Sequence, residues 1–227
     1  MVNTGPNRPI NGKGRYPPET VDPTSLRTVP VQERAKQTVE RVLAAAAQLL
    51  AEGGPDELTT SAVAARAGLK VRNVYRYFPD RAALAAALAD RLNGAVEHAI
   101  GDLSDLADPV VPWQGAVRSA IRRLVAAGAE HPEAVQIRAA MRSNPELQLR
   151  DLESDVRIAD AFFRALRTRG VRPAGPRLSR RMFVLVTAVG AVLDRGVLGS
   201  AHTARALFTE AEELAIAYLT PLIEAQA

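Results

Sequence analysis

Five positively charged side chains fall within sixteen residues of one segment, at Arg66, Lys70, Arg72, Arg76 and Arg81. The segment contains one acidic residue, Asp80, so its net charge of +4 equals the formal net charge of the whole 227-residue chain. Lysine and arginine bind the phosphate backbone of nucleic acids by releasing its counterions. The interleaved tyrosines can bond phosphate oxygens, and arginine and asparagine can bond base edges in the major groove. The chemistry offered by this segment is recognition of a nucleic acid.

Two short helices must position these side chains. Thr60 is expected to cap the start of the first helix, and Gly68 is expected to end it in the left-handed conformation. The second helix is predicted to run from Lys70 to Phe78 and to stop before Pro79. Two short helices joined by about three residues with a glycine in the turn have the spacing of a helix-turn-helix.

The second helix is predicted to turn most of its side chains towards solvent. Val74 and Phe78, four residues apart, are expected to point inward. The polar and charged remainder is expected to face outward: Lys70, Arg72, Asn73, Tyr75, Arg76 and Tyr77. A solvated basic helix on any α-helical protein would carry a similar charge, so charge alone leaves both interpretations open. The turn glycine, the caps and the pairing of two short helices favour DNA.

This run resembles the N-terminal DNA-binding domain of the TetR family of transcriptional regulators, over roughly residues 32 to 93. The matching features are a threonine that opens the second helix, an alanine-glycine turn, an aromatic end to the recognition helix and a basic start to the fourth helix. Here these are Thr60, Ala67-Gly68, Tyr75-Arg76-Tyr77-Phe78 and Arg81. Lys70 departs from the family's common capping serine, and Asn73 from its commonest threonine. The operator sequence therefore cannot be borrowed from relatives.

The resemblance implies a ligand-responsive regulator rather than an enzyme. It implies a repressor that binds double-stranded operator DNA as a homodimer through a helix-turn-helix, and that a small, largely apolar effector releases. No cofactor or metal is expected. The implied DNA-binding residues are Arg34, Thr60, Lys70, Val71, Arg72, Asn73, Tyr75, Arg76, Tyr77 and Arg81.

Composition predicts an all-α protein. Hydrophobic residues make up 47% of the chain and aromatic residues only 4%, so the core must consist mainly of alanine, leucine and valine, which favours closely packed helices over a sheet. The chain has no cysteine, which excludes disulfides, thiolate metal sites and cysteine nucleophiles. It contains neither an apolar stretch long enough for a membrane span nor the apolar core of a signal peptide, so a cytoplasmic protein is expected.

Three parts are predicted along the chain: a disordered arm over residues 1–30, the helix-turn-helix domain over 31–93, and a helical ligand-binding and dimerisation domain over 94–227. The first two parts each carry a net charge of +2, whereas the third is neutral. Excess positive charge is therefore confined to the parts expected to meet DNA. Asp108-Pro109 and Pro112 mark a break just beyond the boundary.

Apolar residues at helical spacing predict the remaining helices. They cover residues 32–52, a fourth helix that Asp80 caps, 113–130, 133–142, 146–168 and 202–225. The segment from Met182 to Leu193 is apolar all round and is expected to be buried on every side, against the domain core and a second subunit. Two such C-terminal helices from each chain would form a four-helix bundle.

Candidate residues for a small-molecule pocket are the scarce aromatic side chains and one arginine-methionine pair: Trp113, Arg138, Met141, Phe162, Phe163 and Phe183. Each is also compatible with an ordinary core or surface position. The three histidines lie in separate segments, and the sequence has no glycine-rich phosphate loop or nucleophile elbow, so catalysis is not expected. A dimeric helical scaffold that binds protein, or DNA without sequence preference, is the alternative from another class; a small-molecule enzyme ranks third.

Overall fold

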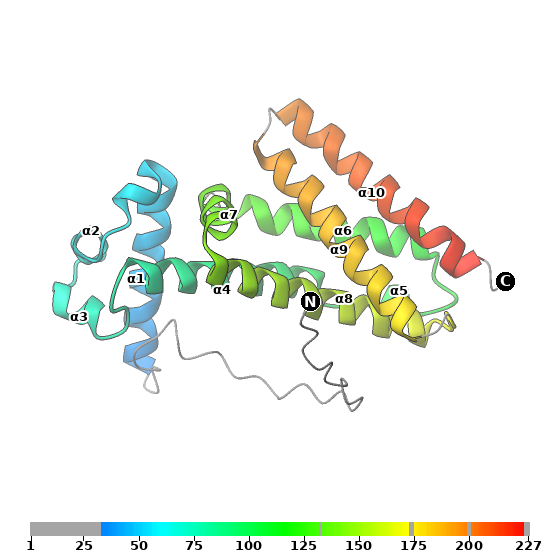
Figure 1. Cartoon of the computed structure of the whole chain (residues 1–227), viewed down its shortest axis with the longest axis horizontal. Helices are drawn as coiled ribbons and strands as arrows, with labels where there is room; N and C mark the ends of the chain where they lie inside the picture. The colour runs from blue at the N-terminus through cyan, green and yellow to red at the C-terminus, as the bar shows by residue number, and fades with distance from the viewer. Residues whose placement is uncertain (1–32, 132, 173–174, 199–200, 225–227) are drawn as a thin grey trace, which may run out of the picture.

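The computed structural model describes residues 33–131, 133–172, 175–198 and 201–224, and in these ranges the chain is helical without any strand (Figure 1). The predicted arm, residues 1–30, lies outside the described residues. In chain order the elements are α1 (Glu33–Gly53), the 3-10 helix η1 (Pro55–Glu57), α2 (Thr60–Arg66), α3 (Val71–Tyr75), α4 (Arg81–Ile100), α5 (Ser104–Ala107), α6 (Trp113–Ala129), α7 (Ala134–Ser143), α8 (Pro145–Thr168), α9 (Gly175–Leu198) and α10 (Ala201–Ile223). The predicted all-α fold is confirmed.

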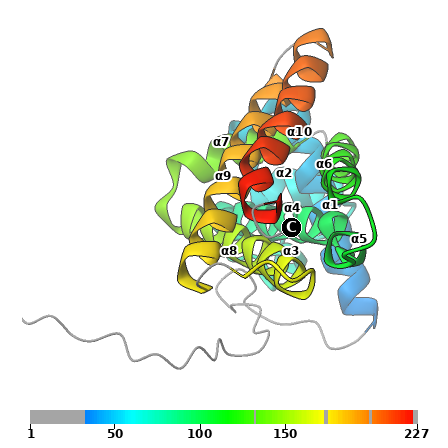
Figure 2. The same cartoon turned by 90° about the vertical axis from the view of Figure 1, so that its right-hand side faces the viewer.

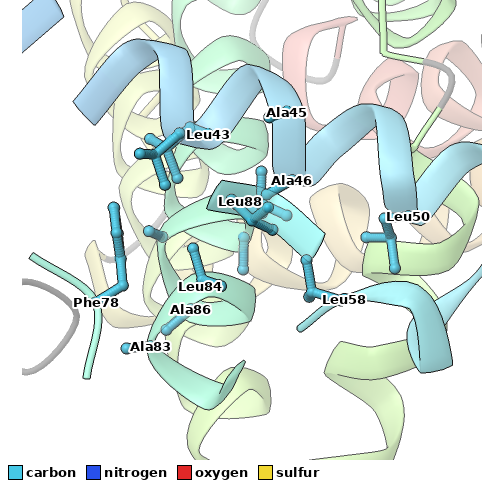
Figure 3. Close-up of a cluster of buried hydrophobic side chains, with 14 of the residues drawn as sticks. Leu43, Ala45, Ala46, Leu50, Leu58, Phe78, Ala83, Leu84, Ala86 and Leu88 are labelled. Carbon is cyan, nitrogen blue, oxygen red and sulfur yellow. The ribbon is translucent and has the colours of Figure 1, made fainter. Parts of the chain in front are cut away.

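A first hydrophobic core joins α1, α2, α3 and the first half of α4. The apolar stripe of α1 is buried as its spacing predicts, at Val39, Val42, Leu43, Ala46, Leu49 and Leu50. Leu58, 2% exposed, closes the core from the loop before α2, and Phe78 and Leu84 have no exposed surface (Figure 3). Asp80 caps α4 as predicted, because its Oδ1 accepts a hydrogen bond from the Ala83 amide at 2.8 Å. This small core fixes the orientation of the helix-turn-helix.

A second core joins the rest of α4 to α5, α6, α8, α9 and α10. Leu166, Leu178, Met182 and Leu219 are among its fully buried side chains. The last two helices, α9 and α10, lie side by side along one flank of this body (Figures 1 and 2). The C-terminal part therefore has a packed interior and one flank formed by a helix pair.

Helices α4 and α7 connect the two cores. Helix α4 runs unbroken through residue 93, where the domain division was placed, and that division stays a prediction. Ala134, Ile137 and Met141 of α7, together with Leu147 at the start of α8, belong to the first core although they follow it far along the chain. Helix α7 packs on α4, so a shift of α7 relative to the second core would reach the helix-turn-helix through α4 and the shared first core.

The apolar segment lies within the longer helix α9, and its predicted burial against a second subunit stays a prediction. The helix begins at Gly175, before the predicted start, and Leu178 extends its buried stripe by another turn. Within the single chain the segment is not buried on every side, because Val184 is 50% exposed and Gly190 and Ala191 are also exposed. One side packs on α8 and α10 and the other faces solvent. None of the described helices is long and apolar enough to cross a membrane.

Candidate nucleic-acid interface and interior cavity

Helix α2 starts one residue earlier than a Thr60 cap would require. Thr59 has the extended backbone of a capping residue, and its Oγ1 accepts a hydrogen bond from the Ala62 amide at 3.1 Å. Thr60 is the first helical residue and is only 8% exposed. The prediction that Thr60 caps the helix is wrong. Both adjacent threonines carry a hydroxyl that could cap the helix, but only Thr59 has the extended backbone of a capping residue.

The turn between α2 and α3 has the predicted glycine geometry. Gly68 has φ +64°, and the amides of Gly68 and Leu69 bond back to the carbonyls of Ala65 and Ala64 at 3.1 and 2.9 Å. These two bonds form the Schellman motif, which ends a helix with a left-handed residue. Helix α1 also holds the turn, because Nη2 of Arg41 donates a 2.7 Å hydrogen bond to the Ala67 carbonyl.

Replacing Gly68 with alanine is expected to lower the free energy of unfolding by about 1–2 kcal/mol, because a side chain disfavours the left-handed conformation. Gly94 is a matched control: it lies in helical backbone on the exposed face of α4 with no heavy atom within 4 Å of an added Cβ. Alanine at position 94 is expected to raise stability by about 0.5–1 kcal/mol. Urea denaturation measures both, and a shift of the two variants in the same direction would contradict this geometry.

The outer face of α3 carries most of the predicted DNA-binding residues. The exposed residues are Lys70, Val71, Arg72, Asn73, Tyr75 and Arg76. Tyr77 was expected to face outward with them, but it is only 5% exposed and belongs to the first core. Helix α3 ends at Tyr75, and the following turn carries Tyr77 and Phe78 inward. The guanidinium of Arg76 lies 5.7 Å from the centroid of the Tyr77 ring, so this tyrosine supports a basic residue.

Ion pairs divide the basic residues of this segment into two groups. Arg66 donates two hydrogen bonds to the carboxylate of Glu52, at 2.8 and 3.0 Å, and the guanidinium lowers the pKa of that carboxyl. Arg81 lies 4.0 Å from Asp56. By contrast, Lys70, Arg72 and Arg76 form no ion pair with any residue that the structure describes. Within this segment, the positive charge that no ion pair offsets therefore lies on α3 and the two residues that flank it. Arg34 is exposed in the first turn of α1.

A cavity of about 460 Å³, partly open to solvent beside exposed residues of α9, lies between α4, α6, α7, α8, α9 and α10. Its walls are mainly apolar and include Ile121, Ile158, Phe162 and Val189. Of the six predicted pocket residues, Arg138 and Phe162 line this cavity. The others do not line it: Trp113, Met141, Phe163 and Phe183. Met141 is instead buried in the first core and Trp113 in the second.

Polar side chains from α7, α8 and α9 meet at the wall of the cavity. Arg138 pairs with Asp151 through Nη1 at 2.7 Å and with Asp194 through Nε at 3.3 Å. The Thr187 hydroxyl donates a 3.0 Å hydrogen bond to Asp155. Burial raises the pKa of the Asp155 carboxyl above its usual range, and the bond from Thr187 opposes that rise. Sequence reasoning identified Arg138 but missed the three aspartates, because residues far apart in the chain supply this group.

Helix α7 joins this polar group to the first core. Arg138 lines the cavity, whereas its neighbour Ile137 and the later Met141 are buried against the helix-turn-helix domain. One short helix therefore carries both a side chain that lines the cavity and two side chains of the core that contains the helix-turn-helix.

Known proteins share this architecture and sequence pattern. Residues 42–88 match the bacterial regulatory proteins of the tetR family, and residues 112–219 match a tetracyclin repressor-like C-terminal domain, so the two ranges together cover more than half of the chain. No curated protein matches the sequence.

Three solved structures illustrate the likeness. A TetR-family transcriptional regulator from Streptomyces coelicolor is 28% identical, with a TM-score of 0.63 over 84% of this chain and 99% of its own. SmeT, the repressor of the Stenotrophomonas maltophilia multidrug efflux pump SmeDEF, is 18% identical, with a TM-score of 0.54 over 85% and 92%. A TetR variant from Acinetobacter baumannii, in complex with minocycline, is 20% identical, with a TM-score of 0.51 over 80% and 96%.

Proposed function

Because this chain belongs to the TetR family of bacterial transcriptional regulators, we propose that it is a repressor that binds double-stranded operator DNA as a homodimer. A small, largely apolar effector in the interior cavity releases it. The observation that carries the DNA-binding part is the outer face of α3, where Lys70, Arg72 and Arg76 are exposed and lack ion pairs with the described residues.

Different residues of this face have different proposed roles. Arg72 and Asn73 are adjacent and exposed at the centre of α3, and their side chains suit bidentate bonds to guanine and adenine. Lys70, Tyr75 and Arg76 flank them and contact phosphates, as do Arg34 and Arg81 nearer the domain edge. Val71, 38% exposed, suits contact with a thymine methyl group. Thr60 and Tyr77 act from within the domain: Thr60 begins α2 and Tyr77 supports Arg76.

A homodimer is proposed because two recognition helices must reach successive major grooves, about 34–36 Å apart, on one face of DNA. The helix pair α9 and α10 offers an apolar surface for this contact. Val184 is 50% exposed and Leu214 is 40% exposed, and Ala191 and Ala217 are exposed on the same two helices. Pairing these helices with their copies would bury this surface in a four-helix bundle.

Replacing Val184 with glutamate is expected to separate the dimer, since the carboxylate would be buried without a partner at the interface. Operator affinity should fall about a hundredfold or more, because the two half-sites would then be bound independently. The same change at Val110, 88% exposed in the loop after α5, is the control and should leave the dimer intact. Analytical ultracentrifugation measures the assembly, and a Val184→Glu protein that stays dimeric would exclude this interface.

We propose that α7 transmits effector binding to the DNA-binding helices and so releases the protein from its operator. A molecule in the cavity meets Arg138, and a shift of α7 then moves Ile137 and Met141 in the first core. Coupling between ligand and DNA sites is typically about 1–3 kcal/mol. The minocycline bound to the Acinetobacter baumannii TetR variant and the repressor role of SmeT support this part by analogy.

We further propose the division into an arm over 1–30, a DNA-binding domain over 31–93 and an effector and dimerisation domain over 94–227. On this proposal the protein acts in the cytoplasm, where it meets the chromosome.

Genome-wide mapping of bound sites, followed by salt titrations on the recovered operator and on a random duplex, tests this function. A regulator should prefer the operator by about a thousandfold or more at physiological salt. Equal affinity for both duplexes would instead support the scaffold that binds DNA without sequence preference.

A further inference from the structure

We propose that the interior cavity takes an amphipathic organic cation, with its apolar body between the helices and a protonated amine bound to Asp155. This inference rests on the proposed function, because it names the chemical class of the effector. It is carried by the shape of the cavity, by its balance of charges and by the partners of each charged side chain.

The volume and the apolar walls of the cavity determine which kind of ligand body it can hold. Its volume of about 460 Å³ falls within the range of about 300–1,000 Å³ that small-molecule sites usually have. Ile121, Leu124, Ile158, Phe162 and Val189 are among its walls. These side chains offer no hydrogen bond, so an aliphatic or aromatic body is favoured there by burial alone.

The charged wall of the cavity is acidic overall. Asp151, Asp155 and Asp194 face Arg138 and Arg195, so three carboxylates meet two guanidiniums. Arg138 is already engaged by Asp151 and Asp194. Arg195 is exposed and donates a 3.1 Å hydrogen bond to the carbonyl of Ala191, one turn earlier. An anionic ligand would have to break the ion pairs of Arg138 and would meet an excess of negative charge.

Asp155 is the carboxylate in this group without a cation of its own. Its hydrogen bond from Thr187 is the interaction that the structure gives it, and it forms no ion pair with the described residues. Arg138 is near enough to attract it electrostatically but is bonded to the other two aspartates. An ammonium group would donate a charge-assisted hydrogen bond to Asp155, whereas a neutral ligand would leave its charge uncompensated.

The Asp155 carboxyl is expected to make the stability of the ligand-free protein depend on pH. Burial raises the pKa of folded Asp155, Asp151 and Asp194 raise it further, and Thr187 and Arg138 oppose the rise. The folded state therefore binds this proton more tightly, so the carboxyl costs no stability below its unfolded pKa and costs most once pH exceeds its folded pKa. Asp155→Asn should raise the unfolding temperature at pH 7, and the gain should vanish in acid. An equal or lower unfolding temperature at pH 7 would contradict an uncompensated carboxylate.

Three probes that share one apolar chain and differ only in head group test the proposal. Isothermal titration of the full-length protein with octylamine, octanol and octanoate separates cationic, neutral and anionic preferences. Octylamine is expected to bind about tenfold or more tightly than octanol, the effect of one charge-assisted hydrogen bond. Asp155→Asn should remove this preference while leaving octanol affinity unchanged. Asp160→Asn is the matched control, because Asp160 is exposed on the same helix, pairs with Arg164 and lies outside the cavity.

Four results would overturn the proposal: no binding of any probe, equal affinity for octylamine and octanol, tightest binding of octanoate, or an unchanged amine preference in Asp155→Asn. Operator binding is measured separately on the same preparations by gel shift. A wild-type protein that binds its operator but shows no amine preference refutes the cationic ligand alone. A protein that prefers octylamine but binds all DNA sequences equally refutes the proposed regulatory function and leaves the ligand class standing.

Discussion

Replacing Arg72 with alanine is expected to weaken operator binding by about 1–3 kcal/mol per half-site, or roughly tenfold to a hundredfold. Arg72 is exposed on α3 and lacks an ion pair with the described residues, so its five donors are free for a base edge. Removing a bidentate contact to a base should also relax sequence preference at one operator position, because the wrong base is then penalised less. Competition gel shifts with single-base operator variants measure both effects.

Arg66 provides the matched control for this change. It is also exposed and basic and belongs to the same segment, but its guanidinium is held by Glu52 through two hydrogen bonds. Arg66→Ala should therefore change operator affinity much less than Arg72→Ala and should leave sequence preference intact. If the two variants lost operator affinity equally, the net charge of the segment would explain DNA binding, and contacts from the outer face of α3 would not. If neither lost affinity, α3 would not be the recognition helix.

Replacing Phe78 with alanine is expected to lower the free energy of unfolding by about 3–5 kcal/mol. Phe78 has no exposed surface, and it lies where the end of α3 meets α1 and α4 (Figure 3). The change removes a large apolar side chain and leaves a cavity that the surrounding helices cannot fully close. Because the same core includes Met141 of α7, the loss should also loosen the connection to the effector cavity.

Chemical denaturation monitored by circular dichroism measures this loss. Val110→Ala is the control, since Val110 is 88% exposed and its truncation should change stability by no more than about 0.5 kcal/mol. A Phe78→Ala protein with wild-type stability would show that the first core does not hold the DNA-facing helices together. A variant that is folded but does not bind DNA would instead show that positioning of α3 fails before the domain unfolds.

The amino-acid sequence by itself determined most of the long helices and the position of the helix-turn-helix in the chain. The helical spacing of apolar residues predicted the buried stripe of α1, and Gly68 predicted the left-handed turn that the structure has. The Asp80 cap was also identified correctly. These features depend on residues within one or two turns of each other, where periodicity and backbone preference leave few alternatives.

The tertiary structure decided which of those residues are available and what surrounds the cavity. Arg66 is neutralised by Glu52, 14 residues away, while Arg72 is left free. Tyr77 turned inward because α3 ends at Tyr75, which apolar spacing alone did not show. Asp155 meets Thr187 across 32 residues. Such pairings depend on how distant helices pack, and a local pattern carries no information about the partner that packing supplies.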